Sequence, residues 1–191
     1  ERLEAVSGIS AYELNFSCPN VKEGGLSFSA NAATAHQVAQ AVRRVTARPL
    51  IVKLTPNVTS ISEIGLAVQE AGADAVSAIN TLVGMSVDIH SRRPRLASVT
   101  GGLSGPAIKP VALAKVYELV RSLRIPVIAI GGIFTAEDAL EFLIVGARAV
   151  QIGTASFVHP DAALQVIQGL EKYCAEQNTS AADLCGTLAL C

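Results

Sequence analysis

Short apolar runs alternate with longer amphipathic stretches along almost the whole chain. The runs have the length and the Val, Ile, Leu and Ala content of buried β-strands, and the stretches repeat apolar residues at the spacing of α-helices. Ser60 with Glu63, and Thr135 with Asp138, form capping-box patterns at the start of two stretches. The pattern predicts strands over residues 11–16, 50–54, 75–79, 126–130 and 149–152, and helices over residues 32–45, 60–71, 110–123, 135–145 and 160–176.

The strict alternation of strands and helices predicts a parallel sheet with right-handed crossovers, as in a doubly wound sheet or a (β/α)8 barrel. The residues that end the strands favour the barrel, because a barrel carries its site at the carboxyl ends of its strands. Polar or glycine residues stand at nearly every such end: residues 15–20, Lys53, Asn80 and Thr81, Gly131 and Gly132, and Gly153 and Thr154.

The chain is short for a complete barrel. It has 191 residues, and a complete eightfold barrel typically has roughly 250. We therefore expect an α/β fold in which residues 1–191 form a single domain, a partial TIM barrel with about five of the eight βα units. The other units would precede Glu1 or come from another chain. The connection from Asn80 to Pro110 is longer than a βα turn needs, which predicts a lid or a partner surface.

Composition and charge argue against several classes of function. Half of the residues are hydrophobic and the net charge is −1, with no basic stripe that would indicate a nucleic-acid partner. The apolar runs are too short to span a bilayer and no signal segment opens the chain, so we expect no membrane association and a cytoplasmic location. The four cysteines form no C-x-x-C pair, and their spacing predicts no metal site.

Glycine-containing turns end two successive strands: the pair Gly131 and Gly132 and, about twenty residues later, the pair Gly153 and Thr154. Glycine lets backbone N–H groups approach an anion closely, and the loops after the last two strands are the recurrent phosphate site of barrels. Either pair alone would favour a simple tight turn. Their recurrence at equivalent strand ends favours phosphate binding.

Lys53 lies in an otherwise apolar strand, where an ammonium group is costly unless an anion or acceptor faces it. One interpretation is a structural ion pair with Glu13 of the preceding strand. The other is that Lys53 stabilises negative charge that develops on a bound group during a reaction.

Cys18 follows the first strand within a polar cluster that includes Asn15, Ser17 and Asn20. A thiolate can act as a base or nucleophile, although a lone cysteine is more often a small buried hydrophobic residue. The surrounding polar side chains favour the reactive interpretation.

Six segments of the sequence form one ordered set: residues 15–20 (NFSCPN), 52–54 (VKL), 79–81 (INT), 100–110 (TGGLSGPAIKP), 131–132 and 153–154. In both order and spacing they resemble the class 1 dihydroorotate dehydrogenases, most closely over residues 11–157. Within that class the runs from Asn80 and from Gly101 are similar to the type B, NAD-linked form. The first βα units of that family have no counterpart here, so the chain resembles an N-terminally truncated catalytic subunit.

The resemblance implies an oxidoreductase of pyrimidine (UMP) biosynthesis that oxidises dihydroorotate to orotate with FMN. Cys18 would be the catalytic base that removes the C5 proton while hydride passes from C6 to N5 of the flavin. The substrate-binding residues would be Asn15, Asn20, Asn80 and Thr81. The cofactor-binding residues would be Asn15, Lys53, Ile79, Gly105, Gly131, Gly132, Gly153 and Thr154.

The resemblance also implies partners. The type B enzymes form homodimers and work with an iron–sulfur flavoprotein subunit, which carries FAD and a [2Fe-2S] cluster and passes electrons to NAD. We expect the present chain alone to bind FMN weakly and to turn over little, because a sheet of five strands leaves its edges exposed.

Three other interpretations remain open. A dihydropyrimidine dehydrogenase-type barrel uses a related flavin site, but it generally carries histidine where this chain has Asn20. A phosphate-binding barrel without redox chemistry would explain the glycine turns but neither Cys18 nor Lys53. A noncatalytic half-barrel that assembles with another chain would explain the length.

Overall fold

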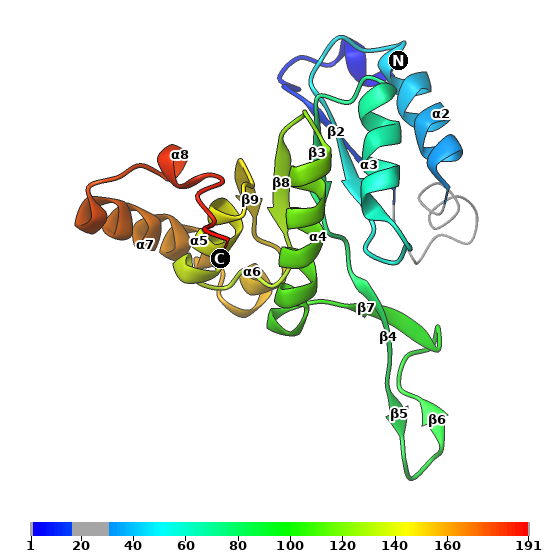
Figure 1. Ribbon diagram of the computed structural model, residues 1–191. Coiled ribbons are helices and arrows are strands. Elements are labelled where there is room, and N and C mark those ends of the chain that lie inside the picture. The colour runs from blue at the N-terminus through cyan, green and yellow to red at the C-terminus, as the bar shows by residue number, and fades with distance from the viewer. Residues whose placement is uncertain (1, 17–30, 191) are drawn as a thin grey trace.

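The computed structural model describes residues 2–16 and 31–190. Its main sheet contains five parallel strands whose spatial order follows their order in the chain (Figure 1). A doubly wound sheet reverses its strand order at a switch point, whereas this sheet has no reversal among its described strands. The arrangement is therefore a segment of a barrel wall, formed by β1 (Tyr12–Asn15), β2 (Leu50–Leu54), β3 (Ala75–Ala78), β8 (Val127–Ile130) and β9 (Ala149–Gln151).

The expected strands and helices of the alternating pattern are confirmed within two residues at each end. At Thr135 both hydrogen bonds of the capping box are present, and at Ser60 the hydroxyl accepts the Glu63 amide. The long helices are α2 (Ala32–Arg43), α3 (Ile61–Glu70), α4 (Lys109–Ser122), α5 (Ala136–Ile144) and α7 (Ala162–Gln177). Shorter helical turns are η1 (Arg2–Ala5), η2 (Pro106–Ile108), α6 (Thr154–Val158) and α8 (Ala181–Leu184).

The core lies between the helices and one face of the sheet. Leu50, Val52 and Leu54 of β2 point to this face and are fully buried. Ile51 and Lys53 point to the opposite face and are only half-buried. Among the described residues, the face that would line the interior of a closed barrel is therefore only partly covered.

The connection between β3 and α4 projects from the body as an antiparallel arm (Figure 1). The sequence predicted a long connection here and identified no strands in it, but four short strands pair within it. They escaped prediction because they are two to four residues long and one of them contains consecutive glycines. The strands are β4 (Leu82–Met85), β5 (Val87–Asp88), β6 (Arg93–Pro94) and β7 (Thr100–Leu103).

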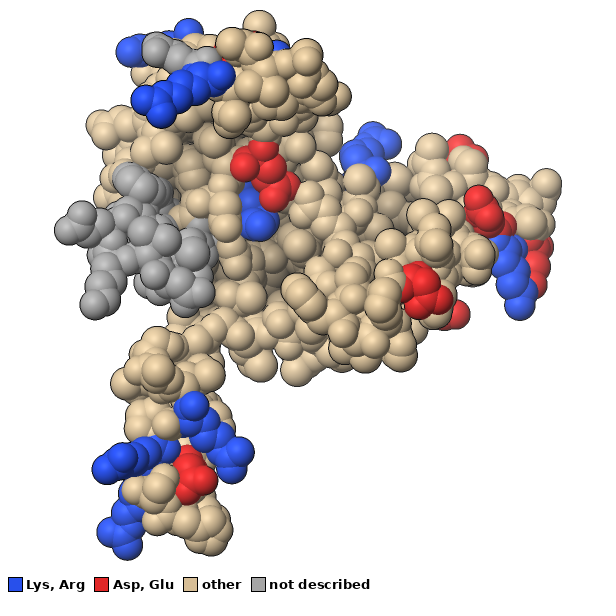
Figure 2. Space-filling model, turned by 180° about the vertical axis from the view of Figure 1, so that it is seen from behind, with Lys and Arg blue, Asp and Glu red and all other residues tan. Residues whose placement is uncertain are grey.

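The arm presents both apolar and basic side chains to solvent. Seen from behind, basic side chains gather at its far end (Figure 2), where the chain carries Arg92, Arg93 and Arg95. Its exposed large apolar residues are Val83, Met85, Val87, Ile89, Leu96, Val99 and Leu103. In the described residues no helix is long and apolar enough to cross a membrane.

Candidate functional site

The carboxyl ends of the parallel strands meet at one edge of the sheet, and a cavity of about 300 Å³ opens there. Most of the residues predicted to bind cofactor or substrate line this single cavity, although they come from segments far apart in the sequence. The predicted residues in its wall are Lys53, Ile79, Asn80, Thr81, Gly105, Gly131, Gly132, Gly153 and Thr154.

Amide side chains from two strands are connected at this edge. Asn80 Nδ2 donates to Asn15 Oδ1 at 2.9 Å, which links the end of β1 to the segment after β3 across β2. Asn80 Oδ1 accepts the Thr81 amide at 2.7 Å, and the Asn80 amide donates to Leu54 O at 2.9 Å. Asn80 is thereby fixed in one orientation, and Asn15 lies beside the cavity through its contact with Asn80.

Lys53 faces both the cavity and Glu13. Its Nζ lies 3.6 Å from Glu13 Oε1, and both side chains are partly buried, with 21% and 27% exposed. At 3.6 Å the two groups attract each other but are beyond the usual length of an N–H···O hydrogen bond. The predicted structural pair is therefore present, and Lys53 also lines the cavity.

The glycine turn after β8 has a conformation and a packing that glycine alone accommodates. Gly131 has a φ of +134° and Gly132 a φ of +77°. A Cβ on Gly132 would lie 2.8 Å from the Lys109 backbone nitrogen, so the turn is pressed against the start of α4. This close approach explains Gly132 without a ligand.

The turn after β9 is different. A Cβ on Gly153 would meet no atom within 4 Å, although the residue lines the cavity. Next to it, Thr154 Oγ1 donates to Ser104 Oγ at 2.8 Å, which joins this turn to the base of the arm. The space beside Gly153 is thus open to a ligand.

An ion-pair cluster between α4 and α5 lies next to the glycine turn. Lys109 Nζ lies 2.7 Å from both Asp138 Oδ1 and Glu141 Oε1. Asp138 Oδ2 also accepts the amides of Phe134 and Thr135, each at 2.9 Å. The cluster therefore ties the start of α4 to the loop that contains the glycine pair.

The cluster shifts the pKa of its members. Burial acts to raise the pKa of Asp138, but hydrogen bonds from Lys109 and from two backbone amides outweigh it, so that the pKa lies below its ordinary value. Hydrogen bonds to Asp138 and Glu141 raise the pKa of Lys109. Both shifts favour the charged forms.

Sequence reasoning did not assign Ser104, Gln151 or Phe157, which also line the cavity. Ser104 lies in the glycine-rich motif, and Gln151 is a polar residue in an apolar strand, the same signal that identified Lys53. Phe157 is 92% exposed, and no pattern in the sequence distinguishes it from a core residue.

Cys18 and Asn20, the predicted base and one predicted substrate contact, lie outside the described residues. Among the described residues there is no group of three or more His, Cys, Asp or Glu side chains that would hold a metal ion. Cys174 and Cys185 are free thiols and partly buried.

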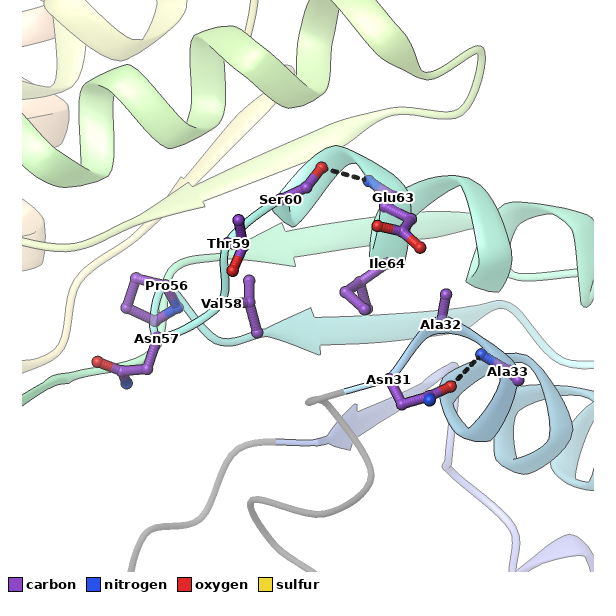
Figure 3. A pocket seen from close by; sticks show the side chains of 10 residues that line it. All are labelled: Asn31, Ala32, Ala33, Pro56, Asn57, Val58, Thr59, Ser60, Glu63 and Ile64. Atoms are coloured by element: carbon purple, nitrogen blue, oxygen red, sulfur yellow. Dashed lines mark hydrogen bonds between the residues drawn. The ribbon is translucent and has the colours of Figure 1, made fainter.

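A second, wider cavity of about 900 Å³ lies between the start of α2 and the loop after β2 (Figure 3). Its polar side chains serve local structure: Asn31 Oδ1 accepts the Ala33 amide at 2.8 Å, and Ser60 Oγ accepts the Glu63 amide at 3.2 Å. Asn57 Nδ2 donates to Thr81 O at 2.9 Å.

Known proteins are similar to this chain in sequence and in fold. The chain is 56% identical over 176 residues to the dihydroorotate dehydrogenase B (NAD(+)) catalytic subunit of Trichlorobacter lovleyi, covering 92% of this chain and 58% of the relative. It is 52% identical over 188 residues to the subunit of the same name from Pelobacter propionicus, covering 98% of this chain and 62% of the relative. The chain thus spans about three fifths of the length of these relatives.

The fold also matches the crystal structure of DHODH from Eimeria tenella in complex with ferulenol. The TM-score is 0.76 at 24% identity, covering 93% of this chain and 54% of that one, and it confirms the predicted α/β partial barrel. The model of the dihydroorotate dehydrogenase family matches residues 3–174. The chain belongs to the dihydroorotate dehydrogenase family.

Proposed function

We propose that this chain is part of the catalytic barrel of an FMN-dependent, NAD-linked dihydroorotate dehydrogenase, which oxidises dihydroorotate to orotate in pyrimidine biosynthesis. The observation that carries the proposal is the cavity at the strand ends, where Lys53, Asn80 and both glycine turns come together. Fewer than two thirds of the relatives' residues are matched. The active enzyme in this proposal closes the barrel with about three further βα units, and we refer to it as the closed-barrel enzyme.

The residues around the cavity fit FMN. Gly153 leaves open space beside backbone that a phosphate can approach, and Lys53 offers a cation three strands away in the sheet. The wall also has apolar residues suited to a flat ring, among them Ile79 and Ile108. FMN, when bound, would supply the hydride acceptor.

The chain's own residues would then bind and orient the reactants. Asn80, fixed by the Thr81 amide and by Asn15, presents its amide beside the cavity for a planar substrate ring. Lys53 would stabilise the negative charge that reduction places on the flavin. Cys18 would remove the proton from C5 of dihydroorotate, which requires a thiolate near that carbon and a site closed to water.

The partners belong to the same proposal. The relatives are named catalytic subunits, and for this chain we propose a homodimer that works with an iron–sulfur flavoprotein subunit carrying FAD and a [2Fe-2S] cluster. The arm exposes apolar and arginine side chains, which supports a dimer contact through the arm. Light scattering of the closed-barrel enzyme, with and without Val87→Asp in the arm, tests this. An unchanged mass for the variant, or a monomeric parent, would contradict a dimer contact through the arm.

The activity is tested with the purified closed-barrel enzyme. We expect bound flavin at one per chain and bleaching of its absorbance by dihydroorotate without oxygen, while dihydrouracil leaves it unchanged. Bleaching by dihydrouracil instead would favour the dihydropyrimidine dehydrogenase-type reaction, and a protein without flavin would favour the noncatalytic half-barrel. The chain of residues 1–191 alone should bind FMN weakly, and stoichiometric tight binding would refute this expectation.

A further inference from the structure

Glu13 connects three strands of the sheet through one carboxylate. It belongs to β1, and its two oxygens face different partners on the open face of the sheet. Oε1 lies 3.6 Å from Lys53 Nζ on β2, whereas Oε2 accepts a hydrogen bond of 2.7 Å from Gln151 Nε2 on β9. Because β1 and β9 are the two edges of the five-stranded sheet, this bond reaches across what would be the barrel interior.

The contact with Gln151 holds the carboxylate at a defined distance from Lys53. A glutamate that was free to move would approach an ammonium group to about 2.8 Å and form a charge-assisted hydrogen bond. Here the shorter bond is the one to Gln151, and among the described residues Lys53 Nζ donates no hydrogen bond. The N–H groups of Lys53 are therefore available to a ligand in the cavity, while the Glu13 carboxylate offsets part of the positive charge of Lys53.

We propose that Glu13, restrained by Gln151, is a positioning residue that sets how strongly Lys53 favours the reduced over the oxidised flavin. The inference rests on the proposed function, since it needs FMN in the cavity that Lys53 and Gln151 line. Reduced flavin carries more negative charge than oxidised flavin, so a stronger field from Lys53 binds the reduced form more tightly. A nearby carboxylate weakens that field.

Two variants should shift the midpoint potential of the flavin in opposite directions. Glu13→Gln keeps the shape but removes the negative charge, and we expect reduced FMN to bind about tenfold more tightly relative to oxidised FMN. This corresponds to a midpoint potential about 30 mV higher for a two-electron couple. Gln151→Met removes the restraint without changing the charge, so the carboxylate can move onto Lys53, and we expect a lower potential.

The experiment measures the midpoint potential of FMN in the closed-barrel enzyme by equilibration with a reference dye, together with the affinity for oxidised FMN. Glu171→Gln, an exposed charge change on α7, is the matched control and should leave the potential unchanged. In a Lys53→Met background, Glu13→Gln should have a smaller effect, because Glu13 is inferred to act through Lys53. Glu13→Asp withdraws the carboxylate by one methylene and should raise the midpoint potential by less than Glu13→Gln does. If Glu13→Gln fails to fold, Glu13→Asp serves as the test.

The outcomes separate the two proposals. An unchanged potential in Glu13→Gln, or shifts of the same sign in Glu13→Gln and Gln151→Met, would overturn the inference and leave the proposed function standing. An equal effect of Glu13→Gln with and without Lys53 would also overturn it. Parent enzyme that binds no FMN would overturn the proposed function and this inference together.

Discussion

Alanine in place of each turn glycine should separate packing from ligand binding. At Gly132 the φ of +77° places the residue in the left-handed region, where a Cβ costs about 1–2 kcal/mol. The same Cβ would lie 2.8 Å from the backbone nitrogen of Lys109, and relieving such a contact typically costs about 1–3 kcal/mol more. Gly132→Ala should therefore lower the free energy of unfolding by about 2–5 kcal/mol.

Gly153→Ala is the matched comparison. Its φ is −110° and its Cβ would meet no atom within 4 Å, so the free energy of unfolding should change by no more than about 0.5 kcal/mol. If the phosphate of FMN approaches this backbone, the methyl group takes that space. Loss of one charge-assisted hydrogen bond would weaken FMN binding about tenfold to hundredfold.

Urea unfolding of the FMN-free closed-barrel enzyme, together with titration of FMN followed by fluorescence, measures both quantities. Unchanged FMN affinity in Gly153→Ala would show that this glycine serves only the turn, which is the interpretation that either turn alone would favour. Unchanged stability in Gly132→Ala would contradict the packing of the turn against α4.

Three further changes test the reaction and the cluster behind the glycine turn. Cys18→Ser should slow flavin reduction by dihydroorotate in stopped-flow measurements and move its pH optimum upward, with FMN binding retained; an unchanged rate in Cys18→Ala would show that another group is the base. Lys53→Ala should weaken FMN binding and slow flavin reduction together, and loss of only one would separate its two roles. Because the pKa of Asp138 is lowered in the folded protein, its charge stabilises the fold above the unfolded value of about 3.9, and this contribution is lost as the pH falls through the folded pKa. Asp138→Asn should thus reduce the free energy of unfolding by about 1–3 kcal/mol at neutral pH. In urea titrations at several pH values, the variant should lose less stability than the parent as the pH falls. An equal loss in both proteins would contradict the lowered pKa of Asp138.

Hydrophobic periodicity was sufficient to predict the elements of the barrel wall, because their core-facing residues repeat at regular spacing. Leu50, Val52 and Leu54 alternate along β2, and all three are fully buried under the helices. The rule that barrel sites lie at the carboxyl ends of strands then placed Lys53 and Asn80 near the glycine turns, and the structure brings them into one cavity.

The arm and the long-range polar contacts could not be predicted in the same way. Among the described residues, the arm strands pair only with one another, and because they bury little surface no apolar pattern marks them. The hydrogen bond between Gln151 and Glu13 joins residues 138 positions apart, and only the curvature of the sheet brings them together. The pair of Lys53 with Glu13 could be predicted without the curvature of the sheet, because their strands are adjacent.

The two faces of the sheet explain why stability and the proposed activity should depend on different parts of the protein. Helices already cover the outer face, where the fully buried residues of β2 and the core residues of α5 lie. The inner face carries Glu13, Asn15 and Lys53 on β1 and β2, and these residues remain partly exposed. A barrel normally fills that interior with side chains from all of its strands. The outer core is therefore packed among residues of this chain, whereas a flavin at the strand ends would be enclosed only after closure of the barrel, when water is excluded and the charges around Lys53 act at full strength.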